Sequence, residues 1–163
     1  DKDDQTTYIT KDLDFDDDLT GIHEKLQNGN PSARFKKISE LSKNTNVELC
    51  DATKTLEYEL ALQSNNIPCL LTAINSVFPE VGVKLRKSVD AETMLENKAI
   101  RIWLFIRARN NWKGEIAQSL GRLLQKQIKD IHNGVEIENP FIVPPYIAKA
   151  IYAVTEPEGL WSV

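Results

Sequence analysis

Eight residues near the middle of the chain, Ala99–Ile106, constrain the fold more than any other stretch. Large apolar side chains fill six of these positions: Ile100, Ile102, Trp103, Leu104, Phe105 and Ile106. Full burial of each such side chain stabilises a fold by about 1.5–3 kcal/mol. Together they contribute on the order of 10 kcal/mol, which is comparable with the net stability of a whole domain. We therefore expect this run to form a central, buried element that the rest of the chain covers.

The charges that flank this run favour a helix. Asp90 can cap a helix over residues 91–109, in which acidic residues come early and arginines late, as the helix dipole prefers. The run is also rich in β-forming residues, so 100–106 can instead pair with 83–87. We predict an all-α fold, either a compact helical bundle or an irregular antiparallel array of helix pairs. The alternative is an α+β fold with a small sheet built from 83–87 and 100–106.

Apolar residues at three- and four-residue spacing, separated by Asn, Gly and Pro, predict further helices. The clearest one extends from Trp112 to His132 and ends at Asn133-Gly134. Pro79 and Gly82 are expected to end the helix before them. The other predicted helices cover residues 19–27, 31–43, 47–63, 68–78 and 146–154.

Acidic and basic residues are unevenly distributed along the chain. Residues 1–20 carry eight acidic residues against two lysines, whereas residues 84–129 carry eleven basic residues against four acidic ones. We interpret residues 1–18 as an acidic flexible tail and residues 19–163 as a single helical domain. Because the tail also contains scattered apolar residues, the alternative is that it docks on the basic middle, in this molecule or in a partner.

The basic middle of the chain is the strongest indication of function. Arginine binds carboxylates and phosphates as a planar fork, and an exposed tryptophan beside it can stack on a base. Trp103 and Trp112 are interleaved with these charges, although both can instead belong to the core, with the arginines as solvated surface residues. The side chains that we expect to bind a partner are Lys84, Arg86, Lys87, Arg107, Arg109 and Lys113.

The acidic remainder of the chain favours a protein as this partner. The net charge is −4, and a net-negative body repels a polyanion outside the contact zone. We therefore predict a non-enzymatic protein–protein interaction domain, of an adaptor or regulatory kind, whose basic face docks an acidic or acidic–hydrophobic segment. A nucleic-acid-binding domain that uses the same residues is the alternative.

Motifs for catalysis or metal binding are not found in the sequence. His23 and His132 lie in different predicted helices, and Cys50 and Cys69 are expected to be buried free thiols. Neither a zinc-binding spacing nor a phosphate-binding glycine loop occurs. We predict no catalytic residue, no metal and no cofactor, and keep a small enzyme with groups converging from distant positions as a third hypothesis.

The sequence contains no apolar run long enough to span a membrane. We expect an intracellular protein, cytoplasmic or nuclear. The chain begins at Asp1 rather than at a methionine, so we expect a fragment or a processed product.

Overall fold

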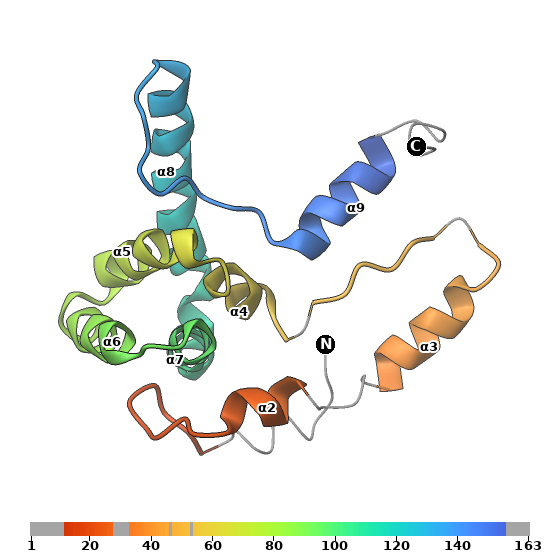
Figure 1. Cartoon of the computed structure of the whole chain (residues 1–163), viewed down its shortest axis with the longest axis horizontal. Helices are drawn as coiled ribbons and strands as arrows, with labels where there is room; N and C mark the ends of the chain where they lie inside the picture. Colours follow the sequence, from red (N-terminus) through yellow and green to blue (C-terminus); the bar gives the residue numbers. More distant parts are fainter. Residues whose placement is uncertain (1–11, 28–32, 46, 53, 156–163) are drawn as a thin grey trace.

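Helices account for all regular secondary structure in the part of the chain that the structure describes. The computed structural model describes residues 12–27, 33–45, 47–52 and 54–155, and these ranges contain no strand. The prediction of an all-α fold is confirmed. The alternative with a sheet is wrong, because both 83–87 and 100–106 are helical. The elements are α2 (Ile22–Gln27), α3 (Ala33–Ser42), α4 (Leu56–Ala61), η1 (Ser64–Asn66), α5 (Ile67–Val77), α6 (Pro79–Ala91), α7 (Leu95–Ala108), η2 (Asn110–Trp112), α8 (Lys113–His132) and α9 (Pro145–Thr155) (Figure 1).

Helix α7 lies at the centre of the core, as predicted for the Ala99–Ile106 run. All positions from Ala99 to Ile106 are buried except Arg101. A helix that is apolar over most of its circumference must be covered on several sides, and α2, α4 and α6 all pack on α7. Helix α5 packs between α6 and α8 and completes the core (Figure 1).

Helix α6 begins where the sequence analysis placed the end of a helix. Pro79 occupies the first turn of α6, where its fixed φ and missing N–H are well tolerated. Phe78 precedes it with φ −129° and ψ 74°, outside the helical region, because a residue before proline disfavours that region. Residues 83–87, the candidate strand, therefore lie inside α6, and Asp90 belongs to its last turn instead of capping α7.

The helix predicted over residues 47–63 is much shorter in the structure. Only α4 is α-helical there, and 47–52 has no regular structure. Thr55 is extended, with φ −135° and ψ 164°, directly before α4, and Glu57 follows in the first turn, where the helix dipole favours an acid. Residues such as Val47 and Asp51 are weaker helix formers, so the apolar spacing alone overestimated the length of this helix.

A buried asparagine attaches the segment between α8 and α9 to the core. The Asn66 side-chain nitrogen donates to the Ile142 carbonyl oxygen at 2.8 Å, and the Ile142 N–H donates to the Asn66 side-chain oxygen at 2.7 Å. The same nitrogen donates to the Leu60 carbonyl oxygen at 3.0 Å. The amide therefore pairs with the backbone as a neighbouring peptide group would, which satisfies a fully buried polar side chain. Asn66 thereby sets the point from which the chain leaves for α9.

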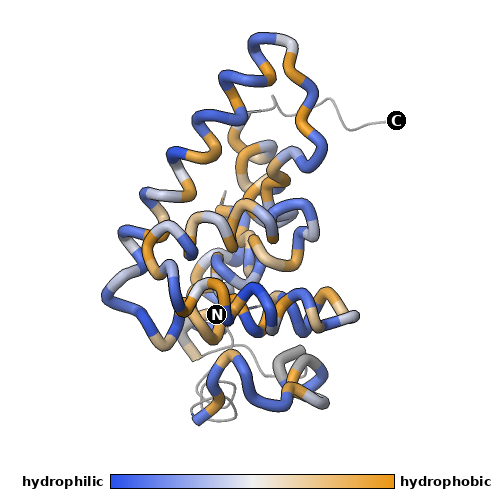
Figure 2. Tube along the Cα trace, turned by 90° about the vertical axis from the view of Figure 1, so that its left-hand side faces the viewer, coloured by the Kyte–Doolittle hydropathy of each residue, from blue (hydrophilic) through white to orange (hydrophobic). Residues whose placement is uncertain are grey.

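Helix α3, the outer half of α8 and α9 extend away from this core (Figure 1). The apolar stripe predicted on α8 is only partly covered: Ile116 is buried, whereas Ile128 and Ile131 are exposed. The free end of α8, at the top of Figure 2, combines hydrophobic and hydrophilic positions. These extensions carry apolar residues that the described part of the chain does not cover.

Candidate functional site

An acidic and apolar segment of the chain lies along the predicted basic region. We call residues 12–22 the strap. Its Phe15 and Leu19 are only 5% and 2% exposed and join the main core together with Ile22. The strap aspartates are exposed, so the apolar side chains face the core and the carboxylates face solvent. The lower edge of Figure 2, where the strap and α2 lie, shows hydrophilic stretches interrupted by a few hydrophobic positions.

Two local turns give the strap its shape. In the first, the Asp14 N–H donates to an Asp17 carboxylate oxygen at 2.7 Å, and the Asp17 N–H donates to the Asp14 carbonyl oxygen at 3.3 Å. In the second, Asp18 accepts hydrogen bonds from the Thr20 hydroxyl at 2.7 Å and from the Thr20 N–H at 3.0 Å. These two bonds stabilise the carboxylate and lower the pKa of Asp18. Gly21 follows with φ +70°, a conformation that glycine adopts without strain.

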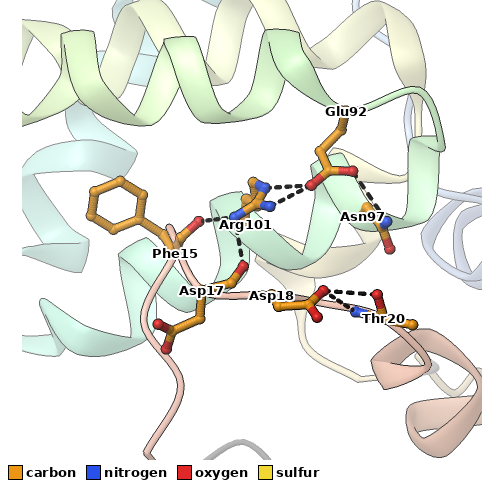
Figure 3. Close-up of polar contacts among 7 residues, drawn as sticks. All are labelled: Phe15, Asp17, Asp18, Thr20, Glu92, Asn97 and Arg101. Atoms are coloured by element: carbon orange, nitrogen blue, oxygen red, sulfur yellow. Dashed lines mark hydrogen bonds and ion pairs between the residues drawn. The ribbon is translucent and has the colours of Figure 1, made fainter.

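Arg101, in the middle of α7, links the strap to the segment between α6 and α7 (Figure 3). Its Nη1 atom donates to the Phe15 carbonyl oxygen at 2.6 Å and to the Asp17 carbonyl oxygen at 3.1 Å. On its other edge the guanidinium forms an ion pair with Glu92, which also accepts a hydrogen bond from Asn97 at 3.1 Å. The Nε atom donates to Glu92 Oε1 at 2.7 Å. Arg101 thus uses the planar fork of arginine to join the α6–α7 connection to the backbone of the strap.

Arg107 holds the beginning of the strap from the last turn of α7. Its Nη2 atom donates to the Leu13 carbonyl oxygen at 3.3 Å, and its guanidinium carbon lies 4.9 Å from the centre of the Trp103 ring. Lys54 is also placed over Trp103, at 5.3 Å. Burial lowers the pKa of Arg107, and the negative charge of Asp14 opposes that change. Two cations and an aromatic face therefore form one desolvated cluster beside the strap.

Arg109 lies among three phenylalanine rings. Its guanidinium carbon is 3.8 Å from the centre of the Phe105 ring, 5.7 Å from that of Phe78 and 5.9 Å from that of Phe15. Phe105 contacts both of the other rings edge-on, with centroids 5.4 Å from Phe15 and 5.8 Å from Phe78. Edge-to-face geometry and a cation over the ring faces are both favourable arrangements. Arg109 thus joins the strap, α7 and the α5–α6 junction.

The six side chains predicted to bind a partner occupy three different environments. Arg107 and Arg109 contact the strap, and Lys113 forms an ion pair with Glu57 at 3.0 Å. The other three lie on α6, where no described residue forms a hydrogen bond or ion pair with their charged groups: Lys84 and Lys87, which are exposed, and Arg86, which is half-buried. Of the two tryptophans, Trp103 is buried in the core whereas Trp112 is 48% exposed.

Sequence reasoning selected Arg107 and Arg109 but not Arg101 or Phe15, the other two residues that hold the strap in place. Phe15 was one of several apolar residues in an acidic stretch, and Arg101 was one basic residue among many. The strap belongs partly to the predicted tail of residues 1–18, of which residues 1–11 lie outside the described ranges. A signal was present, because the alternation of aspartate with Leu13, Phe15 and Leu19 suggests a segment that docks on a basic, apolar surface.

The described residues contain no group of three or more His, Cys, Asp or Glu side chains suited to hold a metal ion. Cys50 and Cys69 are free thiols and are half-buried. Within the same ranges, none of the helices combines the length and apolar character needed to cross a membrane. In comparisons with known proteins, no family model, curated protein or solved structure matches this chain.

Proposed function

We propose that this chain is a non-enzymatic protein–protein interaction domain, of an adaptor or regulatory kind, whose basic and aromatic α7 surface binds acidic–hydrophobic segments. The observation that carries the proposal is the strap itself. A segment of that chemistry already lies on Arg101, Arg107 and Arg109, with one phenylalanine inserted into the core. A partner segment with an aromatic anchor among acidic residues fits the same surface once the strap is displaced.

The contacts of the arginines favour a peptide ligand over a nucleic acid. Arg101 and Arg107 donate to backbone carbonyl oxygens, which every peptide offers in an extended or turned conformation. Arg109 faces rings instead of an open anion site. A peptide also supplies the apolar anchor for which the Phe15 site provides the space, and sheltered apolar contacts contribute affinity that salt does not screen.

The three cations of α6 extend this surface in the proposal. Lys84, Arg86 and Lys87 offer positive charge that the described residues do not neutralise with an ion pair. Exposed charges of this kind accelerate the encounter with an acidic segment and add little affinity. We therefore assign the anchoring contacts to the strap site and the steering of the partner to α6.

A peptide titration on the full chain tests the proposal. A fluorescent peptide with the sequence of residues 12–22 is titrated with the parent chain and with the double variant Phe15→Ala/Leu19→Ala, whose strap is weakened. We expect the variant to bind the peptide roughly tenfold or more tightly than the parent, because the internal competitor is lost. A peptide of equal charge with alanine at the position of Phe15 is the control and is expected to bind weakly.

Salt dependence separates the two ligand classes in the same assay. Nucleic-acid binding that neutralises six to ten phosphates weakens by about 10³–10⁵-fold between 50 and 200 mM salt, whereas the peptide is expected to weaken much less. A labelled single-stranded oligonucleotide is titrated in parallel. Failure of the strap-weakened variant to bind the peptide overturns the proposal. Tight, steeply salt-dependent binding of the oligonucleotide would instead support the nucleic-acid alternative.

A further inference from the structure

A second surface is an apolar groove between α4 and α8, which Ile106 of α7 also lines. Its walls are almost entirely apolar and include Leu56, Leu60, Ile106, Leu120, Gly121 and Leu124. The groove has a volume of about 220 Å³. Pockets for small molecules usually measure about 300–1,000 Å³ and carry several polar groups. A groove of this size and composition suits a few aliphatic side chains from a helix better than it suits a cofactor.

The wall contributed by α8 contains a glycine that the described residues do not require. Glycine is unfavourable inside a helix, and Gly121 lies in the interior of α8. A Cβ atom added at Gly121 would meet nothing within 4 Å, so no neighbouring group within the described ranges requires a residue without a side chain here. A second helix that crosses α8 at this point would use the close approach that glycine permits.

Helix α9 has the pattern that such a groove accepts. Its apolar residues Ile147, Ala150, Ile151 and Val154 follow the spacing i, i+3, i+4, i+7, which places them on one face. Ile151 is 49% and Val154 is 83% exposed, whereas Ile147 and Ala150 are half-buried, so the described residues leave the C-terminal part of this face uncovered. One chain therefore carries both an open apolar groove and a partly uncovered helix with matching anchors.

The segment directly before α9 is held in place, and the helix points away from its own groove. Asn66 fixes Ile142 to the core, and Pro144 is buried directly before α9 begins. On the far side, Lys149 forms an ion pair of 2.7 Å with Glu48. Figure 1 shows α9 projecting away from α4 and α8. These restraints favour a groove on another molecule as the binding site for α9.

We infer that the α4–α8 groove binds helix α9 of a second copy of this chain, and that the exchange is reciprocal. Each copy then contributes one groove and one helix, so the interface closes on itself as a symmetric dimer. The reciprocal arrangement covers Ile151 and Val154 of both copies and places a second helix against Gly121. This interface does not involve the strap, so a negative result for the dimer would leave the proposed function unaffected.

Sedimentation velocity of the full chain tests the exchange, with two variants that leave the folded chain intact. Gly121→Leu fills the groove from a position with open space around it, and Ile151→Glu changes an exposed residue of α9. We expect the parent to be a dimer at about 100 µM. Each variant is expected to raise the dimer dissociation constant by roughly tenfold or more. Ile131→Glu, on the same helix as Gly121 but outside the groove, is the matched control and is expected to leave the dimer unchanged.

A mixture of the two variants provides the decisive result. Gly121→Leu retains a normal α9 and Ile151→Glu retains a normal groove, so an equimolar mixture restores one of the two contacts. We expect heterodimers that are weaker than the parent dimer and stronger than either variant alone. A monomeric parent, or a parent dimer that neither variant weakens, overturns the inference. A monomeric parent whose groove binds a synthetic α9 peptide would assign the groove to a helix from a different protein.

Discussion

Arg101 and Phe15 are 86 residues apart in the sequence, yet the Arg101 Nη1 atom donates a hydrogen bond of 2.6 Å to the Phe15 carbonyl oxygen. The same guanidinium is paired with Glu92 on its opposite edge. One half-buried arginine therefore bridges the acidic strap and the connection between α6 and α7. This contact makes the strap part of the folded domain, and its loss has measurable consequences.

Replacing Arg101 with alanine is expected to free the strap without unfolding the core. The substitution removes the hydrogen bonds to Phe15 and Asp17 and leaves Glu92 without its cation, at a cost of about 1.5–3 kcal/mol for charge-assisted bonds of this kind. Hydrogen exchange measures the effect directly, because the amides of Asp17 and Ile22 donate within the strap. We expect these amides to exchange at least tenfold faster in the variant. Arg86→Ala is the control, and equal protection in both variants would contradict a role for Arg101 in holding the strap.

Reversing the charge of Arg109 is expected to destabilise the domain, whereas the same change at Lys84 is expected to have little effect. Glutamate at position 109 places a carboxylate against the negative faces of three phenylalanine rings. Loss of the cation–π contacts together with burial of an unpaired charge costs about 2–4 kcal/mol. Lys84 is exposed on α6, where substitutions usually change stability by less than about 0.5 kcal/mol. Urea unfolding of the two variants measures this difference, and equal midpoints would show that Arg109 behaves as an ordinary surface residue.

We expect the charge of Glu57 to contribute to the decrease of the unfolding free energy at acidic pH. Burial raises the pKa of this carboxyl group, but a hydrogen bond from its own N–H and the ion pair with Lys113 outweigh it, so the pKa lies below the usual 4.5. A carboxyl group with a lowered pKa in the folded state stabilises the protein above its unfolded pKa. That stabilisation is lost as the pH falls through the lower, folded-state pKa. The difference in unfolding free energy between parent and Glu57→Gln is therefore expected to be constant near neutral pH and to shrink below about pH 4.5.

Urea titrations at several values between pH 7 and pH 3 measure this difference. Glu48→Gln serves as the control, because Glu48 pairs with Lys149 in an exposed ion pair, and exposed pairs contribute little to stability. A parent-minus-variant difference that does not change with pH would mean that Glu57 does not contribute through its charge.

The central helix and the all-α architecture were predictable from the sequence because both depend on where apolar residues can be buried. The run from Ile100 to Ile106 had to be central, and the acids before it and arginines after it favoured a helix. The boundaries were less predictable. Pro79 is compatible with the end of one helix or the beginning of the next, and the non-helical Phe78 resolves this in favour of a beginning.

The strap site was less accessible to sequence reasoning because it depends on contacts between distant segments. Composition identified an acidic stretch and a basic stretch, and docking of one on the other was an open alternative. Which basic residues contact the strap depends on the helical register of α7. Arg101 and Arg107 donate to the strap, whereas Lys113 lies at the start of α8 and pairs with Glu57. No periodicity in the sequence indicates that Asn66 meets Ile142, 76 residues later.

Two glycines inside helices are expected to respond in opposite ways to alanine. Gly82 lies where α6 crosses α5, and a Cβ atom there would be 2.9 Å from the Asn75 Cα atom and 3.0 Å from its side-chain oxygen. A backbone atom cannot move aside as a flexible side chain can, so the two helices must separate. We expect Gly82→Ala to destabilise the domain by about 1–3 kcal/mol, as overpacking in a core does. At Gly121 the added Cβ meets open space, and removal of a helix-interior glycine stabilises by about 0.5–1 kcal/mol.

Thermal unfolding of the two alanine variants beside the parent measures both effects. Low protein concentration keeps any self-association out of the comparison, because association makes the unfolding temperature depend on concentration. Gly114 supplies the control for helix propensity: it also has open space around its missing Cβ, but it lies in the first turn of α8, where glycine costs less than in the interior. Stabilisation by Gly82→Ala would show that α5 and α6 do not approach as closely as the Asn75 contact requires. Destabilisation by Gly121→Ala at low concentration would show that a group of this chain occupies the space beside α8.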